Sequence, residues 1–173
     1  MIALLAAAVL ASGGGTQDIY NGRASQLRVR PPRLEEVGVV VDGRLDEPQW
    51  ARAALLTGFS QFSPNDGAAA EDSTEVLVWY SPTAIHFGIR AFERHGQARA
   101  TLAERDKISG DDYVQILLGT FNDGRQATVF AVNPFGVQAD GTITESNQSR
   151  SSGFTANTVA CRPSLKVPSR IWM

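Results

Sequence analysis

Two adjacent carboxylates, Asp111 and Asp112, are the residues of this chain that most resemble a catalytic acid pair. Paired carboxylates hydrolyse a glycosidic bond when both groups flank that bond. Asp111 and Asp112 begin a strand-like run, where neighbouring side chains point to opposite faces, so they cannot work as such a pair. They are better suited to ending a loop or holding a cation. The sequence has no G-x-S-x-G, phosphate loop or activated cysteine signature, and it predicts a protein that is not an enzyme.

Metal and nucleic-acid chemistry also have little support in the sequence. His86 and His95 stand alone, without a cysteine or a second histidine at the spacing that a transition metal requires. Cys161 is the only cysteine, so no disulfide can form within the chain. The formal net charge is −2, which provides no basic field for a nucleic acid. We therefore expect no cofactor and no nucleic-acid partner.

Polar side chains that could meet a ligand lie on a predicted β-hairpin. Residues 113–121 and 126–133 are strand-like, and Asn122-Asp123-Gly124 between them is a strong hairpin signal. Alternation places Gln115 and Asn133 on one face with Leu117 and Ala131. The opposite face is expected to pack in the core, and it carries Val114, Ile116, Leu118, Phe130 and Val132. For each polar residue the alternative is ordinary packing or solvation.

Trp79 is the third candidate ligand residue. It alternates out of phase with Val76 and Val78, so its ring is expected to face away from their layer, where it could stack on a ligand. The alternative is a packed aromatic at the edge of the fold. Trp50 is expected to cap the core, and Trp172 has no pattern around it.

The remaining elements predict an all-β fold. Further strands are expected at residues 37–41, 75–80, 85–91 and 137–144, with turns at Ser81-Pro82-Thr83 and Pro134-Phe135-Gly136. Only residues 47–55 and 98–105 have a helical composition. Closely spaced strands joined by turns are typical of an antiparallel β-sandwich of jelly-roll or immunoglobulin-like type.

The N-terminus predicts export. Residues 1–15 combine a short apolar run with small residues, as in a secretory signal peptide, and the run is too short to span a bilayer. Residues 16–33 are interpreted as a polar lead-in, and residues 34–153 as one folded domain. The chain is thus expected in the periplasm, at the outer membrane or outside the cell.

Several segments together resemble a known family. They are V-D-G-R-L-D-E-P-Q-W (41–50), S-T-E-V-L-V-W-Y-S-P-T-A-I-H-F-G-I-R-A (73–91), E-R-D-K-I-S-G-D-D-Y-V-Q-I-L-L-G-T-F (104–121) and N-P-F-G-V-Q-A-D-G (133–141). Residues 39–145 thereby resemble a carbohydrate-binding module of family 9, in the version found at the N-terminus of large exported bacterial proteins. The resemblance implies a jelly-roll sandwich, and a parent protein that continues into an outer-membrane β-barrel region.

The resemblance also implies how a sugar would be held. Such modules clamp the sugar between two tryptophans and add polar side chains from neighbouring strands. Gln115 stands where sugar-binding members have a glutamate, and Asn133 matches an asparagine position. Ala131 replaces their arginine, and no tryptophan occurs at Ile108-Ser109-Gly110. The family can carry structural calcium, for which loop donors are Glu93, Asp106, Asp111 and Asp112, although a solvated acidic loop is the preferred interpretation.

The C-terminal residues 154–173 depart from the family pattern, and we interpret them as an aberrant tail from a truncated or frameshifted gene that leaves the sandwich incomplete. The resulting prediction is a non-catalytic glycan-binding module of an exported protein of carbohydrate catabolism. One alternative is a structural or protein-interaction sandwich that has lost sugar binding. A second is a fragment of a glycoside hydrolase whose active site lies elsewhere.

Overall fold

The structure is a computed structural model that describes residues 16–61, 65–94, 96–119, 126–142 and, for the backbone alone, 143–144 and 166–172. The regular secondary structure of the described chain is almost entirely β-strand, with two single-turn 3-10 helices, η1 (Gly22–Ala24) and η2 (Trp50–Arg52). The strands are β1 (Ile19–Asn21), β2 (Ala54–Thr57), β3 (Thr74–Tyr80), β4 (Ala84–Ala91), β5 (Val114–Leu118), β6 (Gln126–Val132), β7 (Gln138–Thr144) and β8 (Lys166–Trp172).

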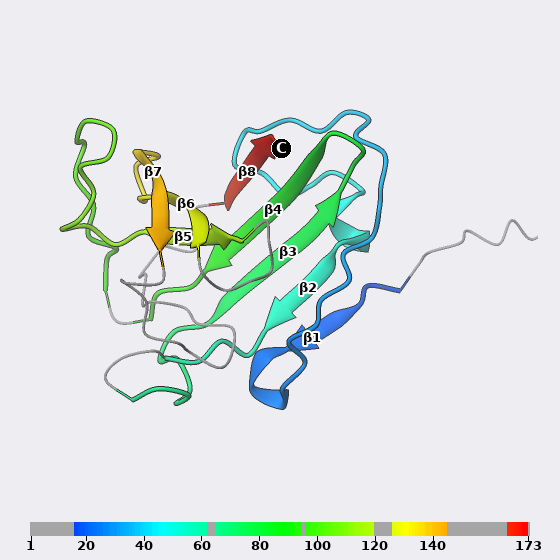
Figure 1. The fold of residues 1–173 in the computed structure, drawn as a ribbon, viewed down its shortest axis with the longest axis horizontal. Helices are drawn as coiled ribbons and strands as arrows, with labels where there is room; N and C mark the ends of the chain where they lie inside the picture. The colour runs from blue at the N-terminus through cyan, green and yellow to red at the C-terminus, as the bar shows by residue number, and fades with distance from the viewer. Residues whose placement is uncertain (1–15, 62–64, 95, 120–125, 145–165, 173) are drawn as a thin grey trace, which may run out of the picture.

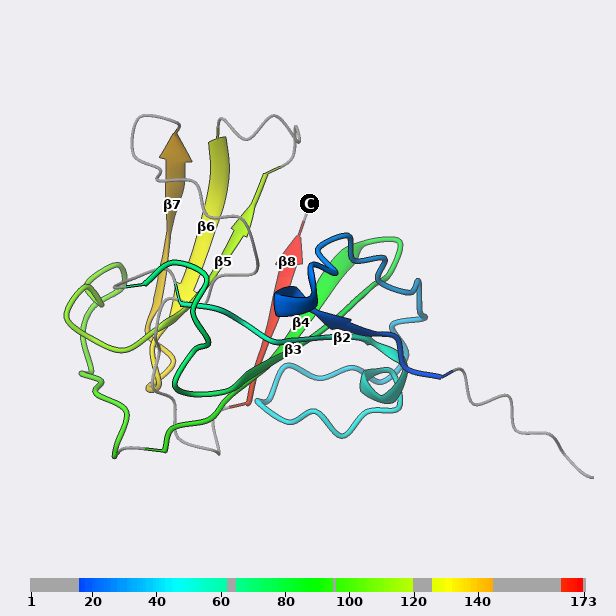
Figure 2. The same ribbon diagram turned by 90° about the horizontal axis from the view of Figure 1, so that it is seen from below.

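These strands form two sheets. The larger sheet has the order β1-β2-β3-β4-β8, and the smaller sheet has the order β5-β6-β7. Neighbouring strands are antiparallel, except that β1 and β2 run parallel. The larger sheet runs diagonally across Figure 1, and Figure 2 shows the smaller sheet at a steep angle to it, beyond β8. The predicted all-β fold of two sheets is confirmed.

The central hairpin of the larger sheet follows the sequence pattern closely. Strands β3 and β4 pair from Thr74 opposite Ala91 to Tyr80 opposite Ile85. Ser81 closes the turn, because its hydroxyl accepts hydrogen bonds from the backbone N–H groups of Thr83 at 3.2 Å and Ala84 at 3.0 Å. This side-chain support is typical of serine in a turn.

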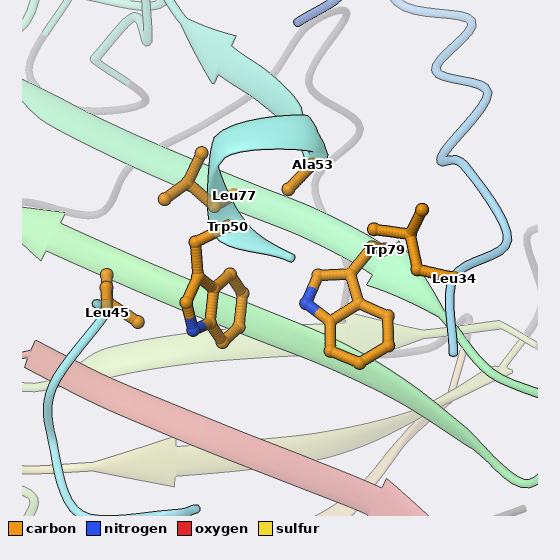
Figure 3. Close-up of a cluster of buried hydrophobic side chains, with 6 residues drawn as sticks. All are labelled: Leu34, Leu45, Trp50, Ala53, Leu77 and Trp79. Atoms are coloured by element: carbon orange, nitrogen blue, oxygen red, sulfur yellow. The ribbon is translucent and has the colours of Figure 1, made fainter. Parts of the chain in front are cut away.

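The buried core lies against one face of the larger sheet. Trp50 and Trp79 meet there edge to face, with ring centroids 5.9 Å apart. Figure 3 shows the cluster, which consists of Leu34, Leu45, Trp50, Ala53, Leu77 and Trp79. Trp50 therefore packs in the core as expected. By contrast, the predicted core face of the hairpin is only half-buried at Val114, Ile116, Leu118, Phe130 and Val132.

The segment interpreted as a lead-in contributes to this sheet. Ile19–Asn21 forms β1, and the backbone N–H of Leu55 donates to the carbonyl of Asp18 at 2.8 Å. Further along, Tyr80 donates to Pro32 at 3.1 Å, and Leu34 donates to Tyr80 at 2.9 Å. Residues 16–33 are thus joined to the domain by backbone hydrogen bonds, which a short polar segment does not reveal in its composition.

The two predicted helices and one predicted strand do not form. Residues 47–55 provide only η2 before the chain extends into β2, where Leu55 pairs with β1 and β3. Residues 98–105 are irregular, because Arg99 and Thr101 use backbone groups in hydrogen bonds to distant residues. Residues 37–41 lack strand pairing, and Val37 is 74% exposed. Tertiary contacts override weak local propensity at each of these segments.

Part of the C-terminal segment also joins the larger sheet. Strand β8 pairs antiparallel with β4 from Ala84 opposite Trp172 to Arg90 opposite Lys166. It occupies the outer position of the sheet and pairs the edge of β4. Residues 145–165, which include Cys161, lie outside the described part of the chain, as do the signal-like residues 1–15 and the hairpin connection Asn122-Asp123-Gly124.

Candidate functional site

A hydrogen-bonded node joins the ends of β5 and β6 and includes one of the predicted site residues. Asn133 is fully buried just after β6, and its side-chain amide donates to Asp111 Oδ2 at 2.8 Å and to the Thr101 carbonyl at 2.9 Å. Its Oδ1 accepts from the backbone N–H groups of Phe135 at 3.0 Å and Val137 at 2.8 Å. An asparagine side chain has two donors and two acceptor lone pairs, and all four are used here. Asn133 has no hydrogen-bonding capacity left for a ligand in this arrangement.

The two carboxylates hold the loop before β5 rather than forming a pair. Asp111 accepts from the backbone N–H of Thr101 at 3.1 Å and from its hydroxyl at 3.0 Å. Asp112 accepts from the backbone N–H of Arg99 at 2.6 Å. The hydrogen bond from Asn133, followed by those from Thr101, holds the pKa of the Asp111 carboxyl below its usual range. Both carboxylates thus stabilise the course of residues 99–101.

Gln115 occupies a different environment on the same small sheet. It is half-buried and makes no side-chain hydrogen bond within the described chain. The register aligns it with Ala131 and Ala139, and the next row of the same face aligns Leu117, Val129 and Gly141. We name these six residues the Gln115 face. Leu117 is 44% exposed, so this face combines a free amide, small side chains and accessible apolar surface.

Trp79 is fully buried on β3 (Figure 3). One side of its ring stacks on His86, with centroids 3.7 Å apart and planes 5° apart, and Trp50 meets it edge to face. Neither side of the indole is open to a ligand in this arrangement, so the structure gives Trp79 a packing role. Alternation places Trp79 opposite to Val76 and Val78 as expected, but that side is covered by residues 34–53 rather than by solvent.

A polar group lies beside this aromatic stack. Glu36 Oε2 accepts from the hydroxyls of Ser81 at 2.9 Å and Thr83 at 3.1 Å, and it lies 3.8 Å from His86 Nε2. Burial lowers the pKa of His86, which favours the neutral imidazole at neutral pH. A carboxylate that already accepts two hydroxyl hydrogen bonds fixes the β3–β4 turn, and this group is therefore structural.

The possible calcium donors do not converge within the described residues. Asp106 Oδ1 accepts from the backbone N–H of Asp140 at 3.1 Å, at the edge of β7, whereas Asp111 and Asp112 hold residues 99–101. Glu93 also has a partner of its own. Among the residues that the structure describes, no group of three or more His, Cys, Asp or Glu side chains could hold a metal ion. His95 lies outside those residues.

A hollow beside β1 was not anticipated from the sequence. Its volume is about 650 Å³, and it is lined by Asp18, Ile19, Tyr20, Ser25, Gln26, Leu27 and Arg28. Neither alternation nor a motif marks these residues. The one available signal is local composition, since residues 19–34 contain four arginines and no acidic residue.

Comparisons with known proteins identify no relative. No family model, no curated protein and no solved structure matches this chain. In the part of the chain that the structure describes, no helix is long and apolar enough to cross a bilayer.

Proposed function

We propose that this chain is a non-catalytic glycan-binding domain and that the Gln115 face of the small sheet is its binding surface. The observation that carries the proposal is the free amide of Gln115 beside exposed Leu117 on a face of small side chains. A sugar ring has a rim of hydroxyls and apolar C–H faces, so an amide next to apolar surface suits it. The resemblance of residues 39–145 to family 9 modules supports the same function.

The expected binding is weak. The Gln115 face lacks a tryptophan clamp, because Trp79 is buried in the core and no tryptophan stands at residues 108–110. One amide and a small aliphatic surface leave little net binding free energy after the cost of ordering the ligand. We expect a Kd on the order of 1 mM, which corresponds to a binding free energy of roughly 4 kcal/mol.

Titration of neutral mono- and oligosaccharides by NMR tests this proposal. Chemical-shift changes should concentrate on β5, β6 and β7, and Gln115→Ala should abolish them. Gln138→Ala is the matched control, because Gln138 is opposite Val132 and so lies on the other face of the same sheet. Saturable binding that Gln115→Ala leaves unchanged would exclude the Gln115 face, and the absence of binding to any saccharide would exclude glycan recognition.

A protein-interaction role is the second candidate, and exposed apolar side chains favour it. Leu102 is 84% exposed and follows Thr101 directly, and Phe135 is 60% exposed and donates its backbone N–H to Asn133. Exposed apolar side chains are suited to contact with another protein. A Leu102→Ser, Phe135→Ser double variant should reduce self-association or partner binding in analytical ultracentrifugation, whereas saccharide binding should be unaffected.

We also propose export of the chain, and attachment of the domain to an outer-membrane region of a longer parent protein. The composition of residues 1–15 supports export. Terminal sequencing of protein from the cell envelope should find an N-terminus between Gly13 and Thr16. A cytosolic product that retains Met1 would contradict this proposal.

A further inference from the structure

The hollow beside β1 is framed by a loop that is fixed by its own hydrogen bonds. The side-chain oxygen of Asn21 accepts from the backbone N–H of Arg23 at 3.0 Å, and the N–H of Asn21 donates to Gln26 Oε1 at 2.8 Å. The N–H of Arg23 also donates to the carbonyl of Gly58 at 3.1 Å, which joins the loop to the end of β2. These hydrogen bonds fix the backbone of the loop and, of the lining residues, the side chain of Gln26.

The approach of this loop to β2 depends on a glycine. Gly58 has a φ of +64°, and a Cβ added there would overlap the Asn21 carboxamide. Asn21, which holds the loop that frames the hollow, is thus in direct contact with the end of β2. A preorganised wall lowers the entropy cost of ligand binding.

The lining has three chemical components. Ile19 and Leu27 are exposed apolar side chains, and Tyr20 adds an aromatic ring. Asp18 and the Nε2 of Gln26 can exchange hydrogen bonds with hydroxyl groups. Arg28 is exposed, lines the same hollow and makes no ion pair within the described chain.

The lining of the hollow carries one acidic side chain, Asp18, and one basic side chain, Arg28, and the adjoining sequence is rich in arginine. Residues 19–34 contain Arg23, Arg28, Arg30 and Arg33, and Asp18, Glu35 and Glu36 flank this segment. All four arginines are exposed, and none forms an ion pair with a described residue. Arginine presents a planar fork that binds a carboxylate through two parallel hydrogen bonds.

We propose that this hollow is a second binding site that takes a carboxylate-bearing sugar, of the uronic acid class. Arg28 binds the carboxylate, Asp18 and Gln26 bind ring hydroxyls, and Tyr20 with Leu27 covers an apolar face of the ring. A simple anion would leave the apolar lining unused, and a neutral sugar would leave Arg28 unused. The volume of about 650 Å³ suits one or two sugar rings. The inference names a substrate class for the proposed glycan binding and rests on it, but at a site separate from the Gln115 face.

Isothermal titration of the full chain with trigalacturonate, and with the neutral galactose trimer for comparison, tests the inference. Arg28→Gln should weaken trigalacturonate binding about 10-fold or more, because a charge-assisted bidentate contact is lost. Arg23→Gln is the matched control, since it removes the same charge from the same segment but does not line the hollow. It should change affinity by less than about 3-fold, as expected of a screened surface charge. The affinity of Arg28→Lys for trigalacturonate should also be lower than that of the wild type, because lysine keeps the positive charge but lacks the planar guanidinium fork.

The results distinguish this inference from the proposed function. Equal weakening by Arg23→Gln and Arg28→Gln would indicate diffuse attraction of an anion and would overturn the site. Binding of both trimers with equal affinity, lost in Gln115→Ala and retained in Arg28→Gln, would overturn the inference and support the Gln115 face. Failure of every saccharide to bind would overturn both proposals. Because Arg28 is exposed, its replacement is not expected to unfold the chain.

Discussion

Asn133 donates its side-chain amide to the carboxylate of Asp111 across 2.8 Å, and both side chains are buried. This hydrogen bond connects the loop before β5 with the turn that leads from β6 to β7. Thr101 forms hydrogen bonds with both Asp111 and Asn133, so the same group of side chains also fixes residues 99–101. A residue that the sequence suggests as a ligand contact is therefore the hydrogen-bonding centre of the small sheet.

Replacement of Asn133 by alanine should destabilise the fold. The variant loses four hydrogen bonds and leaves buried partners unsatisfied, so we expect a loss of about 2–3 kcal/mol in the free energy of unfolding. Urea denaturation followed by tryptophan fluorescence measures this change. Gln115→Ala is the control and should alter stability by less than about 0.5 kcal/mol, as is usual away from buried networks. Similar stability of the Asn133→Ala and wild-type proteins would contradict the structural role of the node.

Stability should fall in acid because of Asp111. Its pKa in the folded protein is lowered by the hydrogen bonds from Asn133 and Thr101, whereas an unfolded aspartate titrates near about 3.9. The ionised carboxylate therefore stabilises the fold above about pH 4, and this contribution is lost as the pH falls from there through the lower folded pKa.

Urea midpoints measured between about pH 5 and about pH 2 reveal this step. Asp111→Asn removes the titrating group, so its stability should be lower at neutral pH but should depend less on pH across the same range. A wild-type slope that the variant reproduces would mean that other carboxylates cause the acid sensitivity.

Replacement of Gly88 by alanine should also destabilise the fold. A Cβ at this position would lie 2.8 Å from Leu45 Cδ2 and 2.9 Å from Trp50 Cζ3, inside the buried cluster. We expect a cost of about 1–3 kcal/mol from overpacking, although alanine is intrinsically favoured over glycine within a strand. Gly96→Ala is the matched control, because nothing lies within 4 Å of its added Cβ. Thermal unfolding followed by circular dichroism should therefore give a lower melting temperature for Gly88→Ala than for Gly96→Ala. Equal melting temperatures would argue against tight packing at Gly88.

Deletion of residues 166–173 tests the role of the C-terminal segment. Strand β8 pairs with β4 along its outer edge, so its removal leaves that edge without a backbone partner and should promote association and lower the melting temperature. An unchanged melting temperature or improved solubility after the deletion would contradict this role and would agree with the aberrant tail that the sequence predicts. Light scattering and calorimetry of the two chains distinguish these outcomes.

The sequence by itself determined the all-β class, the β3–β4 hairpin and the strands of the small sheet. Alternating apolar residues and strong turn residues such as Ser81 and Pro134 are local signals, and local signals survive in the folded chain. The alternation of Trp79 with its neighbours was also predicted correctly, because side-chain direction in a strand depends only on position.

Only the tertiary structure decided what those side chains meet. Trp79 is covered by a segment that begins some forty residues earlier. The side-chain amide of Asn133 donates a hydrogen bond to a loop some thirty residues earlier. Residues 98–105 have helical composition, yet hydrogen bonds to Asp111 and Asp112 hold them in an irregular path. Burial and hydrogen-bond partners are set by long-range contacts whose free energies exceed local propensities, so spacing alone could not separate core residues from ligand contacts.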